Sequence, residues 1–189
     1  MLNNLRNSLQ PHLEKLGRGF SATGLSANFW SAVGLGFAFV AAVVYGLQLE
    51  YSLIFGGILL LVSGFFDIVD GQVAKFTKTT SQKGAFLDSV FDKIAEVAIL
   101  LGILIGNYAE PYLVFLAITL SLLVSYTRAR AESVGITLQG IGIGERAERL
   151  LVIAIIGMIS FMEYAIIIVV IIAAVTFVQR VIVTAKRFG

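Results

Sequence analysis

Six long apolar runs dominate the sequence, and they restrict its fold more than any other feature. A membrane-spanning helix needs about 20 mostly apolar residues, and in lipid the backbone can satisfy its hydrogen bonds only in helices or closed barrels. The runs lack the alternation of barrel strands. We therefore predict an all-α integral membrane protein with six transmembrane helices, placed at residues 28–48, 51–75, 84–106, 111–134, 146–162 and 164–186.

Composition agrees with a membrane protein and excludes several other classes. Hydrophobic residues make up 58% of the chain and charged residues 14%, whereas soluble domains carry about 25% charged residues. The net charge of +2 gives no reason to expect a nucleic-acid partner. The chain has no cysteine and one histidine, which excludes thiolate and multi-histidine metal sites. A soluble enzyme, a disordered chain and a nucleic-acid-binding protein are therefore excluded.

Lysine and arginine are distributed unevenly among the segments that join the spans. They gather before the first span, around the loops after the second and fourth, and at the carboxyl end, whereas the breaks after the first, third and fifth spans carry only glutamate as a charged residue. The positive-inside rule then places both termini and the two longer loops in the cytoplasm. We predict a multi-pass protein of the cell membrane.

The amino-terminal segment differs from the spans because its apolar residues recur at helical spacing. The residues concerned are Leu2, Leu5, Leu9, Leu13 and Leu16. This pattern predicts an amphipathic juxtamembrane helix over residues 1–20 that lies on the inner membrane face. Residues 28–186 then form the six-helix bundle, and the whole chain, 1–189, is predicted to be one membrane domain.

Four aspartates lie where a bilayer penalises charge. Asp67 and Asp70 are three residues apart and Asp88 and Asp92 four apart, so each pair shares one helix face. An aspartate at the centre of a membrane helix costs about 2.5–3.5 kcal/mol. Because the two helices are antiparallel and joined by a short loop, the pairs should meet at similar depth. Oxygen ligands without histidine or cysteine favour Mg²⁺, Mn²⁺ or Ca²⁺, and a pair of such ions would suit phosphoryl chemistry.

A cation- or proton-coupled transporter would also explain intramembrane carboxylates, and charge placement alone does not separate the two functions. Small residues favour an enzyme. Gly71 follows Asp70 directly, Gly84 precedes Asp88 by four residues, and Ala74 keeps the same helix face small. A missing side chain beside the carboxylates lets a large group approach the backbone, which a nucleotide requires and an ion does not.

These residues resemble the signature of the CDP-alcohol phosphotransferases, D-x2-D-G-x2-A-R-x8-G-x3-D-x3-D. The sequence reads Asp67-x2-Asp70-Gly71-x2-Ala74-Lys75-x8-Gly84-x3-Asp88-x3-Asp92. Seven of the eight signature residues are identical and every spacing fits. The departure is Lys75, where the family usually has arginine. Lysine keeps the charge but lacks the planar fork of arginine.

The resemblance implies a role for each matching residue. It implies that two divalent ions, either Mg²⁺ or Mn²⁺, are bound by Asp67, Asp70, Asp88 and Asp92. Asp92 is also implied to be the general base that deprotonates the acceptor hydroxyl. The CDP-lipid, either CDP-archaeol or CDP-diacylglycerol, is implied to contact Gly71, Ala74, Lys75 and Gly84. The expected reaction transfers a phosphatidyl-type group and releases CMP, at a site that faces the cytoplasm.

The acceptor alcohol is predicted from arginines at the cytoplasmic ends of the fourth and fifth spans. These are Arg128, Arg130, Arg146 and Arg149. Arginines beside an acidic metal site form a pocket for a phosphate dianion, although snorkelling, binding of lipid headgroups or pairing with nearby glutamates would explain them too. The segments resemble the phosphatidylinositol-phosphate synthase branch, including its archaeal counterparts. We therefore expect inositol 1-phosphate as the acceptor, with glycerol 3-phosphate as the alternative.

Three further expectations complete the sequence-based interpretation. The family resemblance implies a homodimer embedded in the bilayer. Residues 140–144, which read G-I-G-I-G, are expected to form a flexible loop over the site. A non-catalytic lipid-binding scaffold is a third functional class, and it predicts that all four aspartates tolerate replacement by asparagine.

Overall fold

The structure is a computed structural model that describes residues 2–138 and 140–187, with side chains described from Gln10 onward in the first helix. Throughout these residues the regular structure is helical. The seven helices are α1 (Leu2–Ser21), α2 (Ala27–Gly46), α3 (Ser52–Phe76), α4 (Gln82–Ile105), α5 (Pro111–Ser133), α6 (Arg146–Met158) and α7 (Met162–Lys186). The prediction of an all-α fold is confirmed.

Local sequence signals explain where several helices begin. Ser26 caps α2 and Ser81 caps α4, each by accepting a hydrogen bond from a backbone N–H three residues later, which satisfies a donor that the first turn leaves free. Proline stands at the first position of α5, where its missing N–H is not needed. At α6 the Glu148 carboxylate accepts the backbone N–H of Glu145 at 2.8 Å. These caps fix where α2, α4, α5 and α6 begin.

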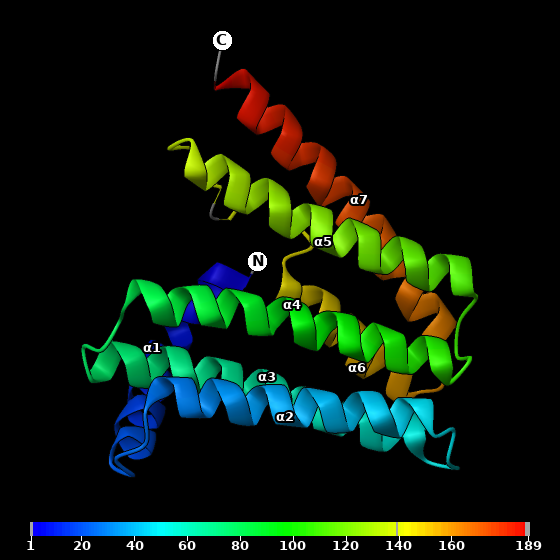
Figure 1. Ribbon diagram of the computed structural model, residues 1–189, viewed down its shortest axis with the longest axis horizontal. Helices are drawn as coiled ribbons and strands as arrows, with labels where there is room; N and C mark the ends of the chain where they lie inside the picture. Colours follow the sequence, from blue (N-terminus) through cyan, green and yellow to red (C-terminus); the bar gives the residue numbers. More distant parts are fainter. Residues whose placement is uncertain (1, 139, 188–189) are drawn as a thin grey trace.

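The helices form two groups (Figure 1). Helix α2 packs against α3 and α4, α5 packs against α7, and α6 joins the groups by contacting α3 and α7. Glycine allows the closest approach between α2 and α4, because a Cβ at Gly102 would collide with the carbonyl oxygen of Ala42. Small residues at helix contacts are typical of membrane bundles. Helices α5 and α7 diverge from α4 at one end (Figure 1).

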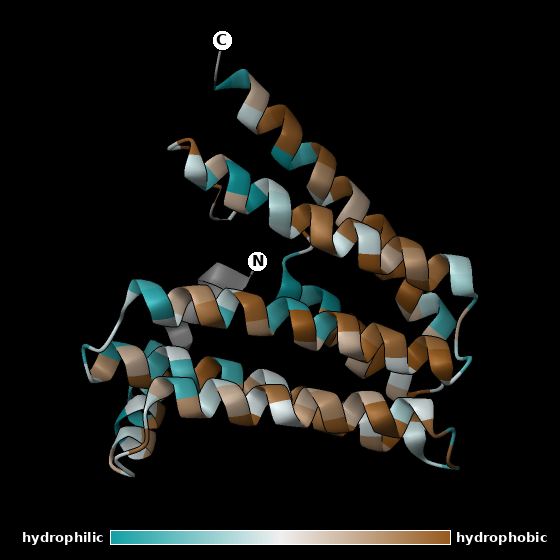
Figure 2. Ribbon diagram, in the orientation of Figure 1, coloured by the Kyte–Doolittle hydropathy of each residue, from teal (hydrophilic) through white to brown (hydrophobic). Residues whose placement is uncertain are grey.

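Among the described residues, four helices are long and apolar enough to cross a membrane, namely α2, α3, α5 and α7. Figure 2 shows apolar residues along most of their length. Helix α4 has 24 residues but carries the charged residues of the predicted site. Helix α6 has only 13 residues, or about 20 Å at about 1.5 Å per residue, which is shorter than the hydrocarbon core of about 30 Å.

The predicted boundaries agree closely with the helices, with one clear exception. The span predicted at 146–162 ends at Met158, and the last helix begins at Met162 instead of residue 164. The turn between them contains Ser160 with a positive φ of 66°, so the apolar run does not continue as one helix. The prediction failed there because the apolar composition continues through the turn.

Helix α1 is confirmed as a helix and packs across α3. Gly17 lies against Gln72, and a Cβ at Gly17 would be 3.0 Å from the Gln72 carbonyl oxygen. Leu2, Leu5 and Leu9 of the predicted leucine stripe lie outside the described side chains, as Met1 and residues 188–189 lie outside the described backbone. The contact with α3 places α1 beside the end of the helix that carries Asp67 and Asp70.

Candidate active site

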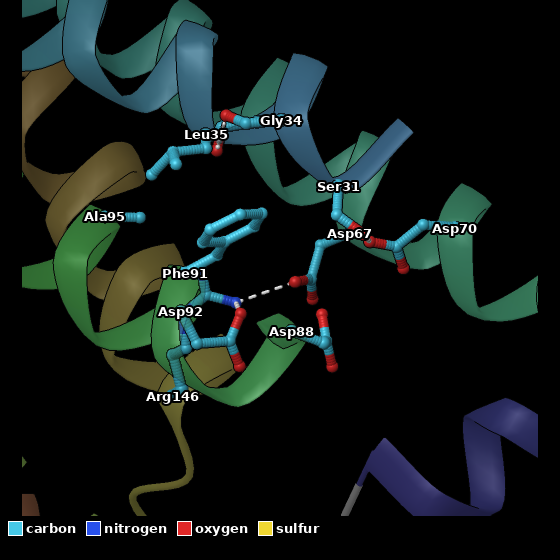
Figure 3. A pocket seen from close by; sticks show the side chains of 11 residues that line it. Ser31, Gly34, Leu35, Asp67, Asp70, Asp88, Phe91, Asp92, Ala95 and Arg146 are labelled. Carbon is cyan, nitrogen blue, oxygen red and sulfur yellow. Dashed lines mark hydrogen bonds and ion pairs between the residues drawn. The ribbon is translucent and has the colours of Figure 1, made fainter. Parts of the chain in front are cut away.

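Three of the four predicted aspartates form one cluster. Helix α3 contributes Asp67, and α4 contributes Asp88 and Asp92, and one carboxylate oxygen of each lies within 4.8 Å of the other two. Figure 3 shows these carboxylates converging from the two helices. Helical spacing puts each pair on one face, and α2, which packs against both α3 and α4, holds these antiparallel helices so that the two faces meet.

Asp70 lines the same pocket but is held separately. It is 6% exposed, and its carboxylate accepts a hydrogen bond of 2.5 Å from the Ser31 hydroxyl on α2 (Figure 3). Ser31 also lines the pocket. Sequence reasoning missed Ser31, although a serine in an otherwise apolar run was an available signal. The contact fixes the orientation of Asp70 relative to the other carboxylates.

Arg146 lies within the acidic cluster. Its Nη1 atom is 2.8 Å from Asp67 Oδ1 and 2.6 Å from Asp92 Oδ1, and Figure 3 shows its guanidinium beside both carboxylates. Lys93 Nζ lies 3.8 Å from Asp92 Oδ2. Four carboxylates therefore face two cations, and negative charge remains. An all-oxygen donor set with excess negative charge fits a hard divalent cation.

The small residues of the signature have different surroundings. A Cβ at Gly71 would meet nothing within 4 Å, whereas a Cβ at Gly84 would lie 3.2 Å from Ser81 Oγ and 3.5 Å from Asn28 Oδ1. Space for a ligand beside the carboxylates thus exists at Gly71, and Gly84 allows α4 to approach the start of α2.

Ala74 and Lys75 lie further along α3. Ala74 is half-buried and Lys75 is exposed. Lys75 lines a hollow between α1 and α3 that it shares with Glu14 and Gln72. This hollow is separate from the pocket of the acidic cluster.

A second, larger cavity of about 840 Å³ adjoins the acidic cluster where α5 and α7 diverge from α4. The three clustered aspartates lie on its wall. Its basic residues are Lys93, Arg128, Arg146, Arg149 and Arg180. The structure therefore brings three of the four predicted arginines to one cavity beside the carboxylates, and it adds two cations that had not been assigned to an acceptor pocket.

Arg130 is the predicted arginine that lies elsewhere. It is exposed, lines a hollow between α5 and α7, and donates to Ser133 Oγ at 3.3 Å. Arg128 lines the large cavity and pairs with Glu132 at 3.0 Å. Residues two apart on a helix point to different sides. The grouping of Arg130 with the other three arginines is therefore corrected.

Arg149 reaches the cavity wall but is almost completely buried, at 1% exposure. Its Nε and Nη2 atoms donate to the Glu96 carboxylate at 2.8 and 2.9 Å, and its Nη1 donates to the Gly144 carbonyl at 2.5 Å. Every guanidinium nitrogen is engaged within the protein. This geometry differs from the expected phosphate contact and makes Arg149 a clamp between α4 and α6.

Arg180 on α7 was interpreted from the sequence only as positive-inside charge. It donates to the carbonyls of Ile141 and Val124 at 3.0 and 2.8 Å, and its Nη2 lies 3.6 Å from Glu145 Oε1. A single arginine within the last apolar run was the signal that could have identified it. Its position on the cavity wall adds α7 to the helices α3, α4, α5 and α6 that line the cavity.

Comparison with known proteins now decides the family. The sequence model of the CDP-alcohol phosphatidyltransferase family matches residues 26–182 of this chain. The chain belongs to this family. It is therefore an enzyme of that class, a membrane transferase of phospholipid biosynthesis, as the aspartate signature had indicated. The transporter and the non-catalytic scaffold are set aside.

Two curated relatives match almost the whole chain. The archaetidylinositol phosphate synthase of Pyrococcus horikoshii is 34% identical over 187 residues, which cover 99% of this chain and 98% of the relative. The archaetidylinositol phosphate synthase of Methanothermobacter thermautotrophicus is 35% identical over 193 residues, which cover 99% and 95%. The alignments cover nearly the whole of this chain and of both relatives, so the similarity extends beyond the signature.

The fold matches that of a solved protein. The crystal structure of Mycobacterium tuberculosis phosphatidylinositol phosphate synthase with CDP-DAG bound matches with a TM-score of 0.80 at 22% identity, over 91% of this chain and 92% of that one. A second crystal structure of that protein, in complex with manganese and citrate, also has a TM-score of 0.80 and covers 91% and 88%.

Proposed function

We propose that this phosphatidyltransferase moves a phosphatidyl-type group from a CDP-lipid to inositol 1-phosphate and releases CMP. The proposal rests on one observation, which is that the acidic cluster adjoins the large basic cavity. Asp67, Asp88 and Asp92 line both the pocket of the acidic cluster and that cavity. A phosphorylated acceptor needs cations beside the reaction centre. The names of the two archaeal relatives agree with this acceptor.

Divalent cations, Mg²⁺ or Mn²⁺, would be held by Asp67, Asp88 and Asp92, with Asp70 as a further ligand. When bound, such ions offset the negative charge that develops on a phosphate leaving group. The residues provide the donors in one place, and Ser31 orients Asp70. The open space at Gly71 would admit the cytidine, and Lys75 would lie towards the nucleotide from the α1 side.

Asp92 is the proposed general base. Its carboxylate lies on the walls of both pockets, so it can face the acceptor hydroxyl and the diphosphate together. It would take the hydroxyl proton while the hydroxyl oxygen forms a bond to the phosphorus that carries the lipid, and the bond from that phosphorus to CMP breaks. Arg146 and Lys93 hold the Asp92 carboxylate in place.

The acceptor phosphate is proposed to bind Arg128 and Lys93 on the wall of the large cavity, where the buried Arg180 adds positive charge while its nitrogens stay engaged with protein groups. Arg128 is the most available, since its only described partner is the half-exposed Glu132. Glycerol 3-phosphate is the second candidate because it would present the same phosphate to the same cations. The lipid would be an archaeol or diacylglycerol derivative.

The membrane arrangement is part of the proposal. Helices α4 and α6 would complete a six-span bundle with the four long apolar helices, α1 would lie on the inner face, and both termini and the active site would face the cytoplasm. The turns predicted on the outer side lie at the end of the bundle opposite the α3–α4 loop (Figure 1). Residues 1–189 would form one domain, and outward-facing apolar residues would support a homodimer.

The test is CMP release by the purified protein in detergent with Mg²⁺ and CDP-archaeol or CDP-diacylglycerol. Inositol 1-phosphate, glycerol 3-phosphate, free inositol and serine are supplied separately. We expect release with inositol 1-phosphate. Release with glycerol 3-phosphate alone would transfer the proposal to the second candidate, and release with a neutral acceptor alone would contradict the role of the basic cavity.

A further inference from the structure

The segment that leads into α6 is anchored to the rest of the protein, contrary to the expectation of a flexible loop. We call residues 140–145 the anchor segment. The hydroxyl of Thr176 on α7 accepts the backbone N–H groups of Ile143 and Gly144 at 3.2 and 2.9 Å. Thr176 is fully buried, with an exposure of 0%. One side-chain oxygen thus holds two consecutive donors just before the helix begins.

Glycines allow the anchor segment to approach α7 this closely. Gly142 has a φ of 113°, and a Cβ there would collide with Thr176 Cγ2. A Cβ at Gly144 would lie 2.9 Å from the Ile172 carbonyl oxygen. Gly142 and Gly144 of the G-I-G-I-G pattern are therefore explained by contact with one turn of α7, because residues without side chains are needed where two backbones meet.

Two arginines complete the anchoring. Arg149 donates to the Gly144 carbonyl while it pairs with Glu96 on α4. Arg180 donates to the Ile141 carbonyl and lies near Glu145. The anchor segment is thus tied to α4 and to α7, two of the helices that line the basic cavity. Each tie lies within five residues of Arg146.

We propose that Thr176 is a positioning residue for acceptor binding. Its hydroxyl holds the backbone of Ile143 and Gly144 at the start of α6, and the same segment holds Arg180 on the cavity wall through the Ile141 carbonyl. Thr176 is absent from the lining of both pockets described above, so it acts through the anchor segment. The inference rests on the proposed function, because it assigns the cavity to the acceptor.

The test compares Thr176→Val, which keeps the shape and removes the acceptor oxygen, with Thr176→Ser, which keeps the oxygen. In Thr176→Val we expect the KM for inositol 1-phosphate to rise about tenfold, the order expected when two buried donors lose their partner. The KM for the CDP-lipid should change less than about twofold, the size of ordinary scatter between mutants. Thr176→Ser should restore the acceptor KM.

Hydrogen exchange measured by mass spectrometry supplies a readout that needs no substrate. We expect faster exchange across residues 140–146 in Thr176→Val but not in Thr176→Ser. The matched control is Thr119→Val on α5, whose hydroxyl donates only to the Phe115 carbonyl of its own helix among the described contacts. It should leave both KM values and this exchange unchanged.

The outcomes separate this proposal from the proposed function. Equal changes in both KM values with unchanged exchange at 140–146 would overturn the positioning role and leave Thr176 as a packing residue. If the wild-type protein is inactive with inositol 1-phosphate, but Thr176→Val still exchanges faster than wild type at residues 140–146, the acceptor assignment is refuted while the anchoring stands. An unchanged acceptor KM in Thr176→Val, with normal wild-type activity, would overturn the inference outright.

Discussion

The pair formed by Glu96 and Arg149 offers the sharpest test of how the site is supported. The two side chains are 2% and 1% exposed, and two hydrogen bonds of 2.8 and 2.9 Å join them. Removing one partner of a buried ion pair leaves an uncompensated charge and costs about 3–5 kcal/mol. We therefore expect Glu96→Leu to lower the free energy of unfolding by about that amount.

A double-mutant cycle isolates the pair. Arg149→Met alone should also be strongly destabilising, since it leaves the Glu96 charge buried and the Gly144 carbonyl without its donor. The double variant removes both charges, so its loss should be smaller than the sum of the single losses by about 2 kcal/mol, within the range seen for contacting residues. Part of the loss should remain, because an unsatisfied buried carbonyl costs about 1–3 kcal/mol.

The assay is unfolding in mixed micelles by titration with sodium dodecyl sulfate, followed by circular dichroism. The matched control is the exposed pair of Arg128 and Glu132, with side chains 41% and 47% exposed. Glu132→Leu should cost at most about 0.5 kcal/mol, since exposed pairs contribute little. A loss below about 1 kcal/mol for Glu96→Leu, or strict additivity in the cycle, would refute the clamp.

Three further predictions concern the reaction. Asp92→Asn should abolish CMP release while CDP-lipid binding, measured by calorimetry, is retained; normal turnover would exclude Asp92 as the base. Ser31→Ala should raise the Mg²⁺ concentration for half-maximal binding about tenfold, the order of one lost hydrogen bond to a charged group, about 1.5 kcal/mol; unchanged binding would show that Asp70 needs no support. Arg128→Ala should raise the acceptor KM and Arg130→Ala should not, and equal effects would contradict their separation.

The sequence was sufficient for the helices and for the identity of the acidic cluster. Apolar runs longer than about 20 residues and helix periodicity are local properties, so they were readable without a structure. Asp67 and Asp70 share a face because of their spacing, and so do Asp88 and Asp92. The limits of α6 were missed because an apolar turn and an apolar helix have the same composition.

The partners of the basic residues at the site could not be predicted from the sequence. The four predicted arginines look alike in the sequence but differ in their surroundings. Arg128 lines the cavity with a single exposed partner, and Arg130 points elsewhere. Arg146 lies among the aspartates, and Arg149 is buried against Glu96. A charged side chain near a membrane surface can reach several partners. Which partner it takes depends on how neighbouring helices are rotated and how far they diverge.

The sequence by itself determined the features that depend on spacing along one helix, namely the helices, the paired carboxylates and the family signature. Only the tertiary structure decided which helices meet. Ser31 reaches Asp70 from α2, Arg180 reaches the cavity from α7, and Thr176 holds the segment before α6. The physical reason is that these contacts join residues far apart in the chain, and no local periodicity records them.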